Sequence, residues 1–483
     1  MNLPWNGTMW ASFPTIRNLN FAAKILKKEP DMMPLKFFVI TDTHYFATKL
    51  GCRGEEYKKF MMYEQKCFAE TEAINKAAFK WLENTNEADI VLIAGDLSFN
   101  GEKESHLEFI GLLKSLKSSG KKIYVITAGH DYNDTPFAFD ETGRLSPEGT
   151  KREELFDLYY EYGFKDAIAV DEVSLSYVAQ LGEGIRLLAL NNDGNEEVGH
   201  TYPPEQIEWI KEQTKKARED NQLLIAMNHY PLLAGSPIFE LLGEGDIVMK
   251  NAREITTMLA DEGVHLCFTG HMHNQSIKSK TTEKGNIFWD VCTGSLIGCP
   301  ASMRLVEVID EHTIRIKTLP VPEFEWDMEG LTNDEYFQRQ FDMMINSLLD
   351  AMEHDPKRFL DKLRAYKRAL EKPVSKIGSK LNRITVGKIC RLLCIKCPES
   401  LKNKLFKEIA VEVVRNIFVG DMPFVEGTDE YTVIMALLRR FSPIINFANK
   451  KIKVNGKDAD LVDIIRNTVG KYGVSDNNAV ITF

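Results

Sequence analysis

Five short apolar segments, each followed by an aspartate or a histidine, constrain the fold of this chain most strongly. Each is five or six residues long and rich in β-branched, aromatic or leucine side chains, which is typical of buried strands. The segments are Leu35–Ile40, Ile90–Ala94, Lys122–Ile126, Leu223–Met227 and 264–268. Helical patterns lie between them, for example at Pro204–Glu219 and 251–262. This alternation of strand and helix predicts a layered α/β domain.

The polar residues that follow these segments are of the types that bind divalent metals. They are Asp42 and His44, then Asp96, then His130 and Asp131, then His229, and finally His271 and His273. In α/β sheets, ligands bind at the carboxyl ends of the strands, so we expect these side chains to meet at one edge. Imidazole and carboxylate together suit borderline divalent metals. Asp96 is the natural bridge, because one carboxylate can hold two cations.

The order and spacing of these motifs resemble the calcineurin-like metallophosphoesterase family. The matching motifs are Asp42-x-His44, Gly95-Asp96, Gly129-His130-Asp131, His229 and Gly270-His271-x-His273, within roughly residues 35–320. The resemblance implies two β-sheets between two helical layers, an α/β/β/α sandwich. It also implies two divalent metal ions, of Mn, Fe or Zn. Asp42, His44, Asp96 and His273 would hold the first ion, and Asp96, His229 and His271 the second.

The same resemblance implies hydrolysis of a phosphoester, by a phosphodiesterase or a phosphatase. The metals would lower the pKa of a bridging water, orient the phosphate and neutralise its developing charge. His130 would donate a proton to the leaving oxygen, and Asp131 would hold the His130 imidazole in the useful tautomer. The pattern is most similar to bacterial phosphodiesterase-like members, although many phosphoesters are cleaved by proteins with these ligands.

One position departs from the family pattern. The family's asparagine ligand before the histidine is replaced by Gly129. We expect water to take its place and the second metal to bind more weakly. The alternative interpretation is a catalytically impaired scaffold or binding protein with the same fold, which need not carry stoichiometric metal.

The length of 483 residues predicts more than one domain. We assign residues 1–33 to an N-terminal extension, 34–322 to the metallophosphoesterase domain, and 323–483 to a mainly helical C-terminal domain. Within the last, the stretch from Lys357 to Lys407 has 16 Lys or Arg residues and three acids. We interpret it first as a solvated face. The alternative is a surface that binds an anionic membrane or nucleic acid.

Composition sets the remaining expectations. No apolar run is long enough to span a bilayer, and residues 1–33 lack the pattern of a secretory signal. The eight cysteines show no framework-like spacing, so we expect free thiols and a cytoplasmic location. The net charge of −10 does not point to nucleic acid as the main partner.

Overall fold

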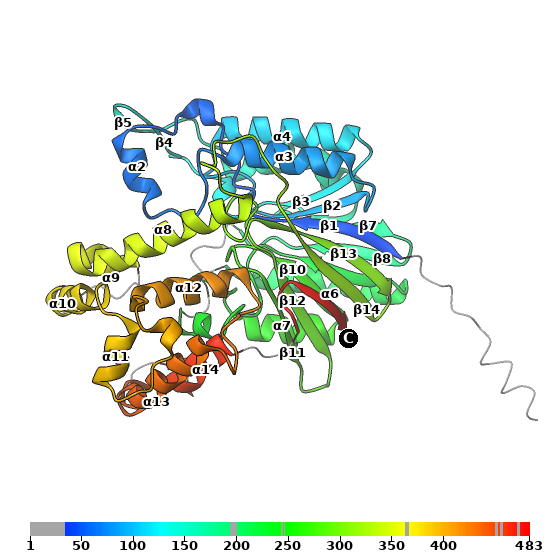
Figure 1. Ribbon diagram of the computed structural model, residues 1–483. Helices are drawn as coiled ribbons and strands as arrows, with labels where there is room; N and C mark the ends of the chain where they lie inside the picture. Colours follow the sequence, from blue (N-terminus) through cyan, green and yellow to red (C-terminus); the bar gives the residue numbers. More distant parts are fainter. Residues whose placement is uncertain are drawn as a thin grey trace, which may run out of the picture.

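The computed structural model describes residues 34–193, 200–242, 245, 247–362, 367–449, 453–454, 457–470 and 474–483. The predicted N-terminal extension, residues 1–33, lies outside these ranges. Two β-sheets lie face to face, and helices cover the outer face of each (Figure 1). The predicted α/β/β/α sandwich with a helical C-terminal region is therefore confirmed.

The first sheet contains three of the predicted strands, which form one half of it. Its order is β17 (Asn478–Thr482), β14 (Thr313–Pro320), β13 (Ser302–Asp310), β1 (Leu35–Ile40), β2 (Ile90–Ala94) and β3 (Lys122–Ile126). Strands β1, β2 and β3 are parallel, so the motifs that follow them reach the same edge. Helices α3 (Thr71–Asn84) and α4 (Lys103–Ser118) lie over the outer face of this sheet (Figure 1).

The second sheet carries the other metal-binding motifs. Its order is β11 (Ser276–Thr281), β12 (Ile287–Cys292), β10 (Val264–Thr269), β9 (Leu223–Met227), β8 (Ile185–Ala189), β7 (Ser176–Gly182) and β6 (Ala167–Asp171). Strands β8, β9, β10 and β12 run parallel. The apolar, β-branched segments within residues 283–318 predict strands that complete this second sheet, which is right for β12 and wrong for β13 and β14. Strand β13 pairs antiparallel with β1, and β14 pairs with β13, so both belong to the first sheet.

The strands of the second sheet are apolar on both faces because each face packs on a different layer. In β9, Ile225 and Met227 belong to the core between the sheets. Leu224 and Ala226 belong to a second core under α6 (Pro204–Glu219) and α7 (Ala252–Asp261). Burial on both sides explains why the strand reads as a continuous apolar run rather than an alternating one.

Residues 55–84 carry one helical pattern but form two helices. Helix α2 spans Glu55–Met61, α3 begins at Thr71, and the residues between them form a loop. The Cys67 amide donates to the carbonyl oxygen of Ile297 at 2.8 Å, which ties this loop to the far end of the domain sequence. A tertiary contact thus overrides the local helical preference. The polar segment after His130 similarly contains a small hairpin, β4 (Ala138–Asp140) and β5 (Gly143–Leu145).

The C-terminal region is mainly helical, as predicted. Its helices are α8 (Asn333–His354), α9 (Pro356–Lys362), α10 (Glu371–Leu381), α11 (Val386–Leu392), α12 (Phe406–Val419), α13 (Asp429–Asn449) and α14 (Leu461–Val469). The region has a hydrophobic cluster of its own, around Val386 and Leu401, and part of it also packs into the core of the preceding domain. Phe337 and Phe341 of α8 lie in the same core as β1 and β2. The last strand, β17, returns to pair with β14. Short elements complete the fold: α5 (Leu155–Tyr159), β15 (Lys453–Val454) and β16 (Lys457–Asp458).

Several cations of the basic stretch pair with acids of their own helical region. Arg383 pairs with Glu353 at 2.8 Å, and Lys404 pairs with Glu412 at 2.6 Å. These pairs fit a solvated face and give no support to a membrane or nucleic-acid partner. Among the residues that the structure describes, no helix has the length and apolar character needed to cross a membrane.

Candidate metal centre

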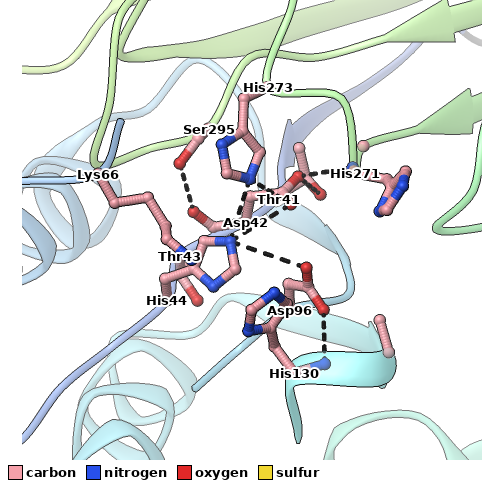
Figure 2. Close-up of polar contacts among 12 residues, drawn as sticks. Thr41, Asp42, Thr43, His44, Lys66, Asp96, His130, His271, His273 and Ser295 are labelled. Atoms are coloured by element: carbon pink, nitrogen blue, oxygen red, sulfur yellow. Dashed lines mark hydrogen bonds and ion pairs between the residues drawn. The ribbon is translucent and has the colours of Figure 1, made fainter. Parts of the chain in front are cut away.

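The predicted ligands meet at one edge of the sandwich, where strands of both sheets end. Figure 2 shows the side chains of Asp42, His44, Asp96 and His273 pointing toward a common centre. Five of the six predicted ligands, all except His229, have a positive φ between 37° and 64°. Non-glycine residues seldom adopt this conformation, which costs of order 1–3 kcal/mol per residue and clusters at functional sites. The backbone is therefore strained where it presents these ligands.

Asp42, His44 and His273 form the first cluster of donor atoms. The Nε2 atoms of His44 and His273 lie 3.1 Å apart, and Asp42 Oδ1 lies 3.2 Å from His273 Nε2. The Nδ1 atoms of the two rings face carbonyl oxygens, that of the Ser98 backbone at 3.3 Å and that of the Gln65 side chain at 3.2 Å. Those oxygens only accept hydrogen bonds, so each Nδ1 carries a proton, and in the neutral ring each Nε2 then presents a lone pair. Two lone pairs this close repel each other unless a cation lies between them.

Asp96, His229 and His271 form the second cluster. His229 donates from Nδ1 to the carbonyl oxygen of Ala94 at 2.7 Å, and its Nε2 faces Asp96 Oδ2 at 3.1 Å. The same Asp96 Oδ2 lies 3.7 Å from Nε2 of His44, which belongs to the first cluster. Asp96 therefore stands between the two clusters, in the position of a bridging carboxylate.

The electrostatics of the centre favour a bound cation. Asp42 Oδ1 and His229 Nε2 are buried, and neither has a hydrogen-bond partner among the described residues. Burial opposes the charge on Asp42, but His273 and His229 outweigh it and hold the pKa of that carboxyl well below its usual range. Burial also lowers the pKa of His229, but Asp96 and Asp42 raise it overall to about 10. Nitrogen and carboxylate donors around an electronegative centre fit Mn, Fe or Zn.

His130 lies beside the two clusters. Its Nδ1 donates to the carbonyl oxygen of Phe99 at 2.7 Å, and its backbone amide donates to Asp96 Oδ1 at 3.1 Å (Figure 2). The ring centroids of His130 and His44 are 4.8 Å apart. Because Nδ1 is held by a carbonyl, Nε2 is the nitrogen left to exchange a proton. Burial, followed by the charge of Lys66, lowers the pKa of His130.

The expected role of Asp131 is wrong. Its carboxylate does not hold the His130 ring, because the Phe99 carbonyl occupies that place. Asp131 Oδ1 instead accepts from the amides of Leu97 and Ser98, and Oδ2 accepts from that of Ala128, each at 2.8 Å. A buried carboxylate satisfied by three amides fixes the two loops that carry Asp96 and His130. Asp131 therefore positions the backbone of these two loops and does not orient the His130 ring.

Several polar residues near the centre escaped the sequence analysis. Lys66 is buried, and its charge acts on both His44 and His130. Asp193 follows β8 and is 3% exposed, with both carboxylate oxygens lacking a partner among the described residues. Burial raises the pKa of Asp193, and Asp131 and Asp96 add to that rise. No metal-ligand spacing marks either residue, so only the folded chain reveals them.

Gly129 leaves space at the position of the family's asparagine. A Cβ atom built there would have one neighbour within 4 Å, the Tyr230 hydroxyl at 3.9 Å. Gly129 does not have a positive φ, so its backbone does not require glycine. The Tyr230 ring stacks between His200 and His271, with centroids 4.0 Å from each.

Comparison with protein families supports the geometry. The family described as calcineurin-like phosphoesterase matches residues 35–275, which include every predicted metal ligand. Residues 35–275 form a calcineurin-like phosphoesterase domain. This phosphoesterase domain contains β1 to β10 and thus both clusters of donor atoms. Strands β13, β14 and β17, which extend its first sheet, lie outside the matched residues.

Solved structures similar to this chain include phosphatases and a nucleotidase. A dimetal phosphatase from Danio rerio aligns with 60% of this chain and 97% of its own, at 12% identity and a TM-score of 0.42. A purple acid phosphatase from yellow lupin (Lupinus luteus) seeds aligns with 61% of this chain and 52% of its own, at 14% identity and a TM-score of 0.41. A 5'-nucleotidase precursor from Thermus thermophilus aligns with 66% of this chain and 60% of its own, at 12% identity and a TM-score of 0.36. None of the curated proteins compared with the chain matches it.

Proposed function

We propose that this chain hydrolyses phosphoesters with two divalent metal ions bound at Asp42, His44, Asp96, His229, His271 and His273. The observation that carries the proposal is the convergence of donor atoms: the Nε2 atoms of His44 and His273 lie 3.1 Å apart, and Asp96 Oδ2 lies 3.7 Å from His44 Nε2 and 3.1 Å from His229 Nε2. Bound divalent cations would supply Lewis acidity and a lowered pKa for an attacking water.

His130 is the residue that we assign to proton transfer to the leaving oxygen. The Phe99 carbonyl fixes its ring and leaves Nε2 free for this task. Asp131 supports that role through the backbone of the two loops rather than through the ring. The candidate activities are those of a phosphodiesterase and of a phosphatase.

The test is a panel of mono- and diester substrates, assayed on metal-stripped protein to which Mn²⁺, Fe²⁺ or Zn²⁺ is returned. His130→Ala should lose about 10²- to 10⁴-fold in rate on an alkyl ester and less on a nitrophenyl ester, whose leaving group needs no proton. His354→Ala is the matched control, because that side chain is 70% exposed. Full activity of His130→Ala on the alkyl ester contradicts the assignment of His130.

The same titration distinguishes the impaired scaffold from the enzyme. An enzyme should bind metal stoichiometrically and turn over at least one ester. A scaffold would turn over none of them with any of the three metals. Protein that is inactive with all metals contradicts the proposed function.

We also propose a reducing location such as the cytoplasm, because all eight cysteines are free thiols in the structure. Maleimide labelling of denatured protein, taken from cells without reductant, should modify eight thiols per chain. Fewer than eight modified thiols would contradict this location.

A further inference from the structure

We propose that Lys66 binds the phosphoryl group of the substrate, so that the site selects an anionic phosphate on the His44 and His130 side of the metal centre. The inference rests on the proposed function, because it assigns a binding residue to the same site. Lys66 lies in the loop between α2 and α3, outside every metal-ligand motif of the sequence.

The backbone around Lys66 is fixed on both sides. The Gln65 side chain contacts Nδ1 of His273 at 3.2 Å and donates to the carbonyl oxygen of Cys299 at 3.3 Å. On the other side, the Cys67 amide donates to the carbonyl oxygen of Ile297 at 2.8 Å. Lys66 therefore lies on a segment that is bonded both to a predicted metal ligand and to a neighbouring loop.

The side chain of Lys66 runs toward the metal centre. Figure 2 shows it extending beside Thr43 and His44. Its ammonium nitrogen lies 4.4 Å from the centroid of the Phe99 ring, and the carbonyl of Phe99 holds His130. The Lys66 charge lowers the pKa of His44 and of His130, after the effect of burial in each case. The side chain of Lys66 thus ends over the Phe99 ring, beside His44 (Figure 2).

The ammonium of Lys66 lacks adequate partners within the protein. Its side chain is 8% exposed, and its nearest carboxylate oxygen, of Glu64, is 4.0 Å away. That oxygen already accepts from the Lys66 backbone amide at 3.1 Å. Among the described residues, no oxygen accepts a hydrogen bond from the Lys66 ammonium. Glu102, the other acid on which its charge acts, is buried with one oxygen unpaired.

Lys121 shows how this protein satisfies a buried lysine that serves structure. Its side chain is 4% exposed, and its ammonium donates to the carbonyl oxygens of Thr85 and Ala88 at 2.6 and 2.7 Å. It also meets Asp89 at 3.3 Å. Lys121 lies just before β3, at the sheet edge opposite the metal centre. The ammonium of Lys66, which donates no hydrogen bond to a described residue, is therefore available to bind an anion in a way that the ammonium of Lys121 is not.

A phosphoryl oxygen is the anion that this place would receive. The proposed metals would hold the phosphate from one side, and His130 faces the leaving oxygen. An ammonium beside His44 can donate hydrogen bonds to a non-bridging oxygen of the same group. A charge-assisted hydrogen bond of this kind strengthens binding by about 10- to 100-fold.

The experiment measures binding of inorganic phosphate to the full chain loaded with Mn²⁺, by calorimetry. Lys66→Met should bind phosphate about 10- to 100-fold more weakly at an unchanged metal stoichiometry. Lys66→Arg, which retains the cation, should recover most of the affinity. Lys121→Met is the control and should bind phosphate like the parent protein. Lys66→Gln replaces the methionine variant if that variant does not fold.

The outcomes separate this inference from the proposed function. If the parent protein binds phosphate and cleaves an ester, and Lys66→Met binds phosphate equally well, the role of Lys66 is wrong and the function stands. If Lys66→Met loses metal together with phosphate, Lys66 acts through the metal site and the inference is also wrong. A parent protein that binds no phosphate with metal bound overturns both proposals.

Discussion

Individual residues at the metal centre adopt conformations that only a bound cation makes favourable. His44 and His273 direct lone pairs at each other across 3.1 Å, and Asp42 leaves one carboxylate oxygen unpaired. Each of these three residues also has a positive φ. Strain and unpaired donors at the same point are the arrangement expected of a site built for a metal rather than for stability.

Gly129 gives the prediction at this scale. Gly129→Asn should tighten the second metal by about 10- to 100-fold, because a ligand side chain replaces water where the structure has room. Activity should rise at limiting metal and change little at saturation. Calorimetric titration of stripped protein measures both affinities, and Gly111→Asn, on an open face of α4, serves as control. Equal affinities in parent and variant would show that another group already fills the place, and Asp193, whose buried carboxylate oxygens have no partner among the described residues, is a candidate.

At the scale of elements, helix α4 is bonded to the loops that carry Asp96 and His130. His106 on α4 is fully buried and bonds the Tyr159 hydroxyl at 2.6 Å through Nδ1 and the carbonyl oxygen of Asp131 at 2.9 Å through Nε2. The carboxylate of Asp131 in turn holds the loops of Asp96 and His130. One histidine therefore joins α4 and α5 to the backbone that presents the proposed acid.

His106 should make the stability of the protein depend on pH. Burial lowers its pKa to about 4, from 6.5 in the unfolded chain. Between these values the unfolded state binds the extra proton, so the free energy of unfolding falls as pH decreases from 6.5 toward 4, by up to about 3 kcal/mol. Urea unfolding of metal-free protein at pH 7 and pH 5 should show a smaller loss in His106→Gln than in the parent. His312→Gln, with a 68% exposed side chain, should retain the parent's loss; an equal loss in His106→Gln contradicts the argument.

At the scale of the whole molecule, part of the helical C-terminal region shares the core of the phosphoesterase domain. Strand β17 crosses back from the helical region, and its Ile481 is 1% exposed opposite Ile314 of β14. Arg304, which is fully buried, reinforces the connection by donating to the carbonyl oxygens of Cys292 and Asn477 at 2.9 and 3.0 Å. A destabilising substitution near residue 480 should therefore also lower the stability of the first sheet, which carries predicted metal ligands.

Ile481→Ala tests this continuity. It should lower the free energy of unfolding by about 2–5 kcal/mol, the usual cost of truncating a buried isoleucine. The urea midpoint of the β-sheet signal in circular dichroism should fall with it. Val480→Ala is the control, because Val480 lies on the same strand and is 53% exposed. If Ile481→Ala leaves the transition of the sheet unchanged, the C-terminal strand does not stabilise the phosphoesterase domain.

The sequence by itself determined the features that depend on neighbours along the chain. The five apolar runs became β1, β2, β3, β9 and β10 at nearly the predicted bounds, and α6 begins and ends where its pattern does. The alternation of strands and helices predicted an α/β domain, the resemblance carried by the motifs implied the sandwich, and the side chains of the motifs do meet. Such features are recognisable because a strand followed by a ligand is a local pattern, encoded within a few residues.

Only the tertiary structure decided what depends on contacts between distant segments. It placed β13, β14 and β17 in the first sheet, broke the helix between Met61 and Thr71, and gave the His130 ring to a carbonyl rather than to Asp131. In each case a partner far along the chain outweighs the local preference, through a backbone hydrogen bond or a shared core. Lys66 is the clearest example: nothing beside it in the sequence marks it, and the bond between Cys67 and Ile297 holds its loop at the metal centre.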